Sequence, residues 1–373
     1  APLANAATPS LRSKQLLTLS ARTPDALAAL SQRMAAYLDD ARLDDKGAAA
    51  TLSLADIAHT ARIGRRAFAY RRSLVAADRA EAARLLRATS VAATTATTDA
   101  PEVAFLCPGQ GAQYPAMGRG LYAAEPVFRD AYDTCCALLA SSMQIGGTTT
   151  GTTSADALRE LFFSDAPDVL VATQLTQPAV FALEYALARL WMSWGVEPVA
   201  LIGHSVGEFV CATLVGVMSL ADALALVALR GRLMQAQPAG SMLSVRLSAA
   251  AIANHLDDAV ELAAENSPAL CVVSGPTPDI ERLEARLAAD GVAAIRLMTS
   301  HAFHSAMMQP VVAPMLAQLQ TMTLHAPRIP IVSTVTGDWL NDTEACDPRY
   351  WAEHLRRPVR FAPAASRLLE NPN

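Results

Sequence analysis

The sequence contains few of the features that hold metals, form disulfide frameworks or cross membranes. Its six cysteines show no C-x-x-C spacing, so they predict neither a metal site nor a disulfide framework. Histidines and glutamates do not cluster at ligand spacing, and no signal peptide or run of about 18 apolar residues is present. We therefore expect reduced thiols, no metal, no membrane contact and a cytoplasmic location.

Positive charge is also scarce. The 30 lysines and arginines are outnumbered by 35 aspartates and glutamates, which gives a net charge of -5 and a pI of about 5.8. Such a chain lacks the basic surface that nucleic-acid binding requires. Apolar residues, in contrast, are plentiful: 52% of the 373 residues are hydrophobic and only 17% are charged. This predicts a large core and two or three compact units.

The most informative motif is Gly203-His204-Ser205-Val206-Gly207-Glu208, a G-x-S-x-G pattern. An apolar run at 199–202 precedes it and predicts a strand, and residues 209–214 continue as an apolar helix. Small residues beside a serine permit the sharp turn that exposes a nucleophile, with the helix N-terminus facing a developing oxyanion. The pattern predicts a catalytic serine, Ser205; the alternative is a small-residue turn without chemistry.

Arg230 lies in an apolar segment, residues 220–230, for which we predict a helix with Ser219 as N-cap and Asp222 three residues later. An arginine on so apolar a helix needs an anion, and its guanidinium matches a carboxylate with two parallel hydrogen bonds. This favours a substrate with a free carboxyl group. The alternatives are a surface arginine or a structural ion pair.

Two of the seven histidines, His301 and His304, fall in the short segment 300–305. Either could be the general base for Ser205, because imidazole takes up a proton near neutral pH. The residues alone leave this choice open.

These motifs together carry a family resemblance. The chain resembles the malonyl-CoA:acyl carrier protein transacylase family, and specifically an acyltransferase domain of a modular type I polyketide synthase, with the ketosynthase-to-acyltransferase linker domain at its N-terminus. The resemblance covers essentially the whole chain. It rests on the Gly203 to Glu208 motif and on segments 108–113 (PGQGAQ), 176–179 (TQPA), 301–304 (HAFH), 350–351 (YW) and 355–361 (LRRPVRF).

The resemblance implies which residues react. Ser205 corresponds to the nucleophile and His304 to the general base, so His301 is not the base. Family members orient the base through a backbone carbonyl, and the matching strand here is 331–337. Many relatives have asparagine where this chain has Thr334, a departure that should matter little if only the carbonyl is used.

The resemblance also implies how the substrate is held. Gln110 and the backbone N–H of Val206 correspond to the oxyanion hole, where each donor typically contributes about 2.7 to 4 kcal/mol. Arg230 corresponds to the clamp for the malonyl carboxylate. Four further residues correspond to substrate-binding positions: Gln177, Asn266, His301 and Phe303.

The implied reaction is a two-step transfer. Ser205 takes the malonyl group from malonyl-CoA as an ester, and the phosphopantetheine thiol of an acyl carrier protein then removes it. No bound cofactor is implied, since coenzyme A and the phosphopantetheine arm belong to the substrates. A covalently linked ketosynthase is a further implied partner.

The histidine box also predicts the extender unit. Among relatives HAFH accompanies malonyl and YASH accompanies methylmalonyl, and the bulk of Phe303 leaves less room for an α-methyl group. Val206 also resembles the malonyl class. One methyl group in an apolar pocket is worth only about 1 to 3 kcal/mol, so we expect a strong but incomplete preference. Ordinary core packing is the alternative role for Phe303.

Three other functions stay open at this point. The first is a methylmalonyl-selective acyltransferase. The second is a catalytically silent scaffold, against which the four matching site residues argue. The third is a serine hydrolase or thioesterase, which would use the same serine but needs an acidic partner between serine and histidine; the candidates are Asp257, Asp258, Asp279 and Asp290.

The chain is predicted to have three parts. Residues 1–98 form the small α/β linker domain, whose end is marked by a threonine-rich run at 94–98. Residues 99–237 and 301–373 form an α/β-hydrolase-like catalytic domain. The intervening residues 238–300 show the order βαββαβ, which is ferredoxin-like, and this insertion would place the pocket in the cleft between the two subdomains. A Gly- and Thr-rich run at 146–153 predicts a surface loop.

Overall fold

The computed structural model describes residues 12–40, 52–88, 94–95, 101–143, 154–166 and 169–370. The loop predicted at 146–153 lies outside these residues. The chain divides into two compact units, Ala1–Pro101 and Glu102–Asn373.

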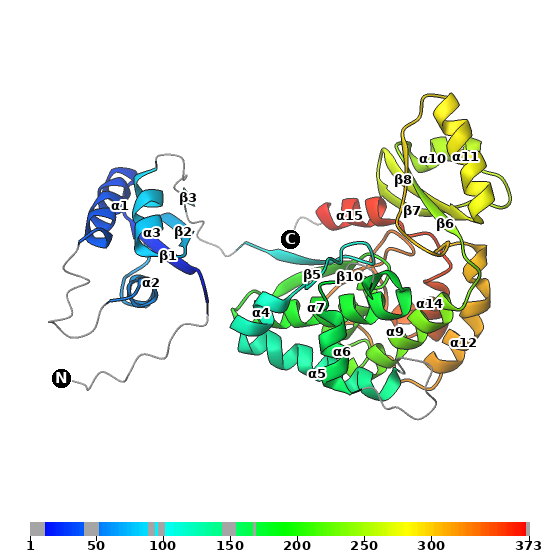
Figure 1. The fold of residues 1–373 in the computed structure, drawn as a ribbon, viewed down its shortest axis with the longest axis horizontal. Helices are drawn as coiled ribbons and strands as arrows, with labels where there is room; N and C mark the ends of the chain where they lie inside the picture. Colours follow the sequence, from blue (N-terminus) through cyan, green and yellow to red (C-terminus); the bar gives the residue numbers. More distant parts are fainter. Residues whose placement is uncertain are drawn as a thin grey trace. The chain divides into compact units, whose positions relative to one another are not determined.

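The first unit contains a three-stranded antiparallel sheet in the order β1-β2-β3 (Figure 1). The predicted helix start at Thr23 is confirmed, since its hydroxyl accepts the Ala26 N–H and Pro24 occupies the first turn. The helices share an apolar core with the sheet. The threonine run begins with β3, so it contributes a strand to this sheet. The elements are β1 (Gln15–Ala21), α1 (Pro24–Leu38), α2 (Leu54–Ile63), β2 (Tyr70–Ala76), α3 (Arg79–Arg87) and β3 (Thr94–Thr95).

The second unit is built on a short parallel sheet in the order β10-β5-β4. Its strands are β4 (Val103–Cys107), β5 (Pro198–Gly203) and β10 (Ile331–Val332). Helices cover both faces. On one face, Ala364 of α15 packs with Ile202 and Val332; on the other, Leu201 and Ile331 join the large core formed with α5, α7, α8 and α9 (Figure 1). This confirms the predicted α/β class.

The main helices of this unit are α4 (Arg119–Ala124), α5 (Pro126–Ser142), α6 (Ala155–Phe162), α7 (Thr173–Ser193), α8 (Gly207–Leu214), α9 (Leu220–Gln235), α12 (Gln309–Leu319), α13 (Asp342–Ala345), α14 (Pro348–Glu353) and α15 (Phe361–Leu369). α9 begins as predicted, with the Ser219 hydroxyl accepting the Asp222 N–H. Among the helices that the structure describes, none combines the length and apolar character needed to cross a membrane.

A small subdomain interrupts this unit after α9. Its elements follow the predicted βαββαβ order: β6 (Ser241–Val245), α10 (Ala249–Ile252), β7 (Glu261–Ser267), β8 (Leu270–Gly275), α11 (Thr277–Ala289) and β9 (Ala294–Arg296). The four strands form one antiparallel sheet in the order β7-β8-β6-β9, and they share a core of their own with both helices. The ferredoxin-like architecture is therefore confirmed.

The subdomain contacts the rest of the unit beside the end of β5. Asn266 of β7 lies 3.0 Å from His204 through its side-chain oxygen, and Ala264 forms a bridge with Val359. Because His204 directly precedes Ser205, β7 packs next to the predicted nucleophile.

Candidate active site

The turn between β5 and α8 holds Ser205. Its φ of 53° lies in the left-handed region, which is unfavourable for a serine and is typical of a nucleophile held on a strained strand-to-helix turn. The flanking glycines are sterically required. A Cβ on Gly203 would lie 2.2 Å from the Glu208 nitrogen, and one on Gly207 would lie 2.2 Å from the Cys107 oxygen.

His304 lies against this serine. Its Nε2 is 2.9 Å from the Ser205 Oγ, and its Nδ1 is 2.7 Å from the backbone carbonyl oxygen of Arg357. A carbonyl oxygen only accepts hydrogen bonds, so Nδ1 carries the ring proton and the Nε2 lone pair faces the serine hydroxyl. His304 also has a positive φ, 56°. The arrangement suits proton transfer from Oγ to Nε2.

The carbonyl that orients His304 is not the one expected from residues 331–337. β10 ends at Val332, and the carbonyl belongs to Arg357, in the segment that leads to α15. Thr334 binds Glu208 instead, through its hydroxyl at 2.6 Å and its N–H at 3.0 Å. The expectation was wrong because every residue carries a carbonyl, and only the fold decides which one faces a given ring.

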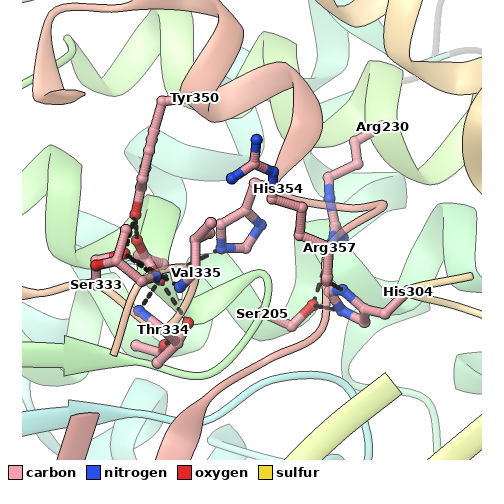
Figure 2. Close-up of polar contacts among 12 residues, drawn as sticks. Ser205, Arg230, His304, Ser333, Thr334, Val335, Tyr350, His354 and Arg357 are labelled. Atoms are coloured by element: carbon pink, nitrogen blue, oxygen red, sulfur yellow. Dashed lines mark hydrogen bonds and ion pairs between the residues drawn. The ribbon is translucent and has the colours of Figure 1, made fainter. Parts of the chain in front are cut away.

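A buried polar cluster, the Glu208 cluster, consists of Glu208, Thr334, Tyr350 and His354, of which Figure 2 labels the last three. Glu208 has no exposed surface, and it accepts hydrogen bonds from Thr334 and from the Tyr350 hydroxyl and lies 3.4 Å from His354 Nε2. Burial acts to raise the pKa of Glu208, but His354, Thr334 and Tyr350 outweigh it and lower the pKa. Neither Glu208 nor His354 has a role predicted from the sequence. The available signal was a glutamate in an otherwise apolar helix, which needs partners when buried.

Arg230 approaches Ser205 from α9 and is only 2% exposed. Its Nη1 donates to the Gln177 Oε1 and its Nη2 to the Ser205 Oγ at 3.2 Å. Its Nε has no hydrogen-bond partner, and no carboxylate of the described residues forms an ion pair with it. Burial lowers the pKa of Arg230 to about 9, which leaves the guanidinium charged at neutral pH. Arg230 is thus neither a surface residue nor, within the described residues, half of an ion pair.

Hydrogen bonds connect Arg230 to Gln110 through two buried side chains. Gln177 donates from Nε2 to the Thr173 hydroxyl at 2.7 Å, and this hydroxyl donates to the Gln110 Oε1 at 2.7 Å. We call these four residues the Arg230 chain. Gln110 follows Gly109, where an added Cβ would lie 3.4 Å from the Ser205 Cβ. The Arg230 chain therefore ends beside the nucleophile.

The Val206 N–H lies at the start of α8, where backbone donors have no partner within the helix. Val206 directly follows Ser205, and Gln110 follows Gly109, whose backbone lies close to the serine. The Val206 N–H and the Gln110 amide are therefore two neutral hydrogen-bond donors near Ser205. This pair can stabilise a negative oxygen that forms during attack on a carbonyl.

The other predicted site residues have their hydrogen bonds and ring contacts with residues other than Ser205. Asn266 binds His204, as described above. His301 lies 2.7 Å from the Ser300 hydroxyl through Nδ1 and 3.1 Å from the Gln237 carbonyl oxygen through Nε2. The Phe303 ring stacks on His301 at 6.1 Å between centroids and is 7% exposed.

The surroundings of His304 favour its neutral form. Burial lowers its pKa well below the ordinary value, and the charge of Arg230 and the neighbouring His354 lower it further, while the bond to the Arg357 carbonyl acts in the opposite direction. His304 is therefore unprotonated at neutral pH and can accept the proton of Ser205.

Among the residues that the structure describes, no carboxylate binds the Nδ1 of His304, where a hydrolase triad has its acidic partner. The Nδ1 of His304 faces a carbonyl oxygen, whereas three of the four candidate aspartates pair within the inserted subdomain: Asp257 with Arg286, Asp279 with Arg282 and Asp290 with His255. Nor do the described residues contain three His, Cys, Asp or Glu side chains grouped to hold a metal ion.

Comparison with known proteins now identifies the family. Residues 104–373 match the family described as acyl transferase domain. The chain belongs to this family. Residues 15–86 of this acyltransferase match a second family, described as CurL-like, PKS C-terminal, which corresponds to the linker region that follows a ketosynthase.

The acyltransferase is similar to type I polyketide synthases. It is 40% identical over 271 residues to a phenolphthiocerol/phthiocerol polyketide synthase of Mycobacterium tuberculosis, and the match covers 73% of this chain and 18% of that protein. The chain thus spans less than a fifth of this curated relative.

Two solved structures show the same fold. The acyl transferase domain of SpnD, in complex with 2-(pent-4-yn-1-yl)malonyl, is 38% identical with a TM-score of 0.83, covering 97% of this chain and 83% of that one. Malonyl CoA-acyl carrier protein transacylase from Burkholderia pseudomallei is 31% identical with a TM-score of 0.60, covering 71% of this chain and 87% of that one. The chain is thus an acyltransferase domain of the type I polyketide synthase class.

Proposed function

We propose that this acyltransferase moves a malonyl unit from malonyl-CoA, through an ester on Ser205, to the phosphopantetheine thiol of an acyl carrier protein. The observation that carries the proposal is Arg230, a buried cation with a free Nε, no carboxylate partner among the described residues and an Nη2 located 3.2 Å from the Ser205 Oγ. A buried charge without a counter-ion is costly. The free carboxylate of a malonyl group would supply that counter-ion next to the nucleophile.

The named relatives support a substrate of this class. The SpnD domain is in complex with a malonyl derivative, and the Burkholderia enzyme is named for malonyl-CoA and acyl carrier protein. Both substrates share the carboxylate that, in our proposal, Arg230 binds.

The first half-reaction uses the geometry around Ser205. His304 Nε2 removes the hydroxyl proton, and Oγ attacks the thioester carbonyl of malonyl-CoA. The Gln110 amide and the Val206 N–H stabilise the negative oxygen of the tetrahedral intermediate. The C–S bond then breaks, and the proton held by His304 passes to the coenzyme A sulfur. The malonyl group is left as an ester on Ser205.

The second half-reaction repeats these steps with another thiol. His304 takes the proton of the phosphopantetheine thiol of the carrier protein, and the sulfur attacks the seryl ester at its carbonyl. The C–O bond breaks and the proton returns to Ser205. The malonyl group ends on the carrier as a thioester. In this proposal, groups of this chain carry every step and no resident cofactor is required.

We assign the choice of malonyl over methylmalonyl to Phe303. Its ring stacks on His301, and its carbonyl oxygen accepts the Ser274 hydroxyl at 2.8 Å, so β8 and the histidine box hold it in place next to His304. A fixed ring resists an α-methyl group by sterics alone. The expected discrimination is about 1 to 3 kcal/mol.

The linker match supports a ketosynthase as the neighbouring partner within one synthase. Residues 15–86 match the region that follows a ketosynthase in such proteins, and the first unit has its own sheet and core. The carrier protein is the second proposed partner, since it is the acceptor in the transfer.

The test is intact-protein mass spectrometry after brief exposure to malonyl-CoA and methylmalonyl-CoA in competition. We expect a malonyl adduct that is absent from a Ser205→Ala variant. A dominant methylmalonyl adduct would support an acyltransferase but contradict the role of Phe303 in selecting malonyl. Release of coenzyme A without any adduct would indicate hydrolysis, and absence of both would indicate a silent domain.

A further inference from the structure

The carbonyl that orients His304 lies in a short segment, residues 355–360, which joins α14 to α15 and forms neither helix nor strand. Figure 2 shows Arg357, which carries this carbonyl, next to His304. Because Pro358 follows Arg357, the backbone of Arg357 disfavours the helical region and stays extended. Contacts with other parts of the fold must then set where the carbonyl lies.

Strand β7 of the inserted subdomain holds this segment at two points. Arg356 donates from Nη1 to the Glu261 Oε2 at 2.7 Å and from Nη2 to the Glu261 Oε1 at 3.0 Å. The backbone N–H of Val359 donates to the Ala263 carbonyl oxygen at 2.9 Å, as part of a parallel bridge to β7. Along the chain, the Arg357 carbonyl lies between these two attachments.

We propose that Arg356 and Glu261 are positioning residues for the general base, His304. Their ion pair fixes the segment whose carbonyl, that of Arg357, orients the ring. The proposal rests on the proposed function, in which His304 takes the proton of Ser205. In this assignment the two side chains touch no reacting atom and act through the Arg357 carbonyl.

The geometry of the Arg356–Glu261 pair differs from that of an ordinary surface ion pair. The two side chains are 27% and 32% exposed, and the Arg356 Nε is buried without a hydrogen-bond partner among the described residues. Two parallel hydrogen bonds fix the direction of a guanidinium as well as its distance from the carboxylate. The pair therefore restrains residue 356 directly before the residue that carries the carbonyl.

The attachment to β7 connects the inserted subdomain with the alignment of the base. Ser205 lies on the turn after β5 of the parallel sheet, whereas the segment that orients His304 is held by β7. Proton transfer requires the base within hydrogen-bond reach of the hydroxyl, so a misaligned ring slows the reaction even when substrate is bound. We therefore expect the pair to affect the chemical step more than substrate binding.

The test compares Glu261→Gln, which keeps the size of the side chain, with Glu284→Gln, which removes a partner of Arg296 elsewhere in the subdomain. The readout is the single-turnover rate of Ser205 acylation by malonyl-CoA. We expect Glu261→Gln to lower the maximal rate by roughly 5- to 50-fold, less than the roughly 10²- to 10⁴-fold that general acid–base catalysis contributes, since His304 is retained. The half-saturating malonyl-CoA concentration should change by less than about threefold, and Glu284→Gln should react at the normal rate.

A double-mutant cycle tests whether the two residues act as a pair. The double variant Arg356→Met/Glu261→Gln should lose little more than either single variant. Additive losses, a normal rate in Glu261→Gln or equal slowing in Glu284→Gln would overturn the proposal. If Glu261→Gln does not fold, as judged by circular dichroism and thermal melting, Arg356→Lys is the second variant. It keeps the charge but not the two parallel hydrogen bonds, and it should also slow acylation.

NMR spectra of protein labelled with ¹⁵N-histidine separate positioning from a merely structural role. Because the Arg357 carbonyl accepts the Nδ1 proton, the His304 ring of the unmodified protein should be in one tautomer. A His304→Ala sample assigns its signals. Glu261→Gln should shift the Nδ1 signal or give a mixture of tautomers. Slower acylation with an unchanged His304 signal would show that the pair acts elsewhere, and the proposal would be wrong.

This outcome is distinguishable from failure of the proposed function. If the unmodified protein forms no malonyl ester on Ser205, the proposed mechanism fails before any variant is considered. If the ester forms at the same rate in the unmodified protein and in Glu261→Gln, only the positioning role is lost.

Discussion

Glu208 and Arg230 are two buried charged residues near Ser205, and their hydrogen-bond partners differ. In Figure 2, Thr334, Ser333 and Tyr350 gather on one side of His354, and Ser205, His304 and Arg230 lie on the other. In the Glu208 cluster, the carboxylate is met by Thr334, Tyr350 and His354. In the Arg230 chain, the guanidinium has one neutral amide, the serine hydroxyl and an unpartnered Nε.

The difference indicates what each charge is for. A buried charge whose hydrogen bonds are complete within the protein gains nothing from a ligand and contributes to the native structure. A buried charge with an unfilled partner is destabilising until an ion of opposite sign arrives. We therefore expect Glu208 variants to lose stability and Arg230 variants to lose activity with the carboxylate-bearing substrate.

We expect the largest effect, a loss of stability, when the Glu208 cluster is disrupted. Glu208→Gln replaces a carboxylate oxygen that accepts hydrogen bonds with an NH2 group that donates them, so buried donors of the cluster lose their acceptor. Each such loss typically costs about 1 to 3 kcal/mol in the free energy of unfolding, and more for charged groups. Because partners lower the pKa of Glu208 in the folded state, its contribution is present above the ordinary carboxyl pKa and is lost as pH falls through the folded value. Urea unfolding at neutral and acidic pH measures both effects.

A matched control is Glu284→Gln, which removes a partner of Arg296 at the exposed surface of the subdomain. Such pairs contribute about 0 to 1 kcal/mol. If Glu208→Gln is no less stable than this control, the interpretation of the Glu208 cluster as structural is wrong.

The next largest effect is expected for Arg230→Met, which keeps an unbranched side chain of similar length but removes the charge. Loss of one partner of a buried, hydrogen-bonded ion pair with the substrate carboxylate typically costs about 2 to 5 kcal/mol, or roughly 30- to 4,000-fold in the rate of Ser205 acylation by malonyl-CoA. Stability should stay within about 1 kcal/mol of the unmodified protein or increase. Rates come from single-turnover acylation and stability from urea unfolding.

Acetyl-CoA provides the control for this prediction, since it lacks the carboxylate. The unmodified protein should strongly prefer malonyl-CoA, and Arg230→Met should lose most of that preference. An equal slowing with both substrates would show that Arg230 acts on the serine and not on the carboxylate.

The contrast between these regions also explains what could be predicted from sequence. Ser205 and His304 stand in short motifs whose residue types point to chemistry, and the glycine spacing predicts the turn. Arg230 is detected as a single charge in an apolar segment. Glu208 stands in the same motif as Ser205, but its partners Tyr350 and His354 come more than 140 residues later, so nothing local reveals that it is buried.

Backbone partners are harder still to predict. The carbonyl of Arg357 that orients His304 carries no side-chain signature, which is why the sequence favours the strand at 331–337 instead. Thr173 likewise precedes the TQPA segment as an ordinary helix residue. Its hydrogen bonds to Gln110 and Gln177 depend on how the chain brings these side chains together, which only the three-dimensional structure provides.

A smaller effect is expected from a variant that tests the role of Phe303 in substrate selectivity. If Arg230 recognises the carboxylate and Phe303 the space beside it, Phe303→Ser should leave malonyl transfer largely intact and improve methylmalonyl transfer. The expected gain in the ratio of the two is about 1 to 3 kcal/mol, or roughly 5- to 150-fold. Competition between the two thioesters, read by intact mass, measures the ratio. An unchanged ratio would return Phe303 to a role in core packing.

The smallest expected effect is a shift in the pH dependence of acylation without loss of activity. Measuring this shift tests whether the charge of Arg230 lowers the pKa of His304. Burial, Arg230 and His354 together lower the pKa of His304, so kcat/KM for acylation should fall only well below pH 6.5. Arg230→Met removes one positive neighbour, so the pKa should rise and the acidic limb should move to higher pH. Arg230→Lys retains the charge and should keep the limb near its original position. If the limbs of both variants coincide with that of the unmodified protein, Arg230 does not set the protonation of His304, and the function left to the unpartnered charge is to bind substrate.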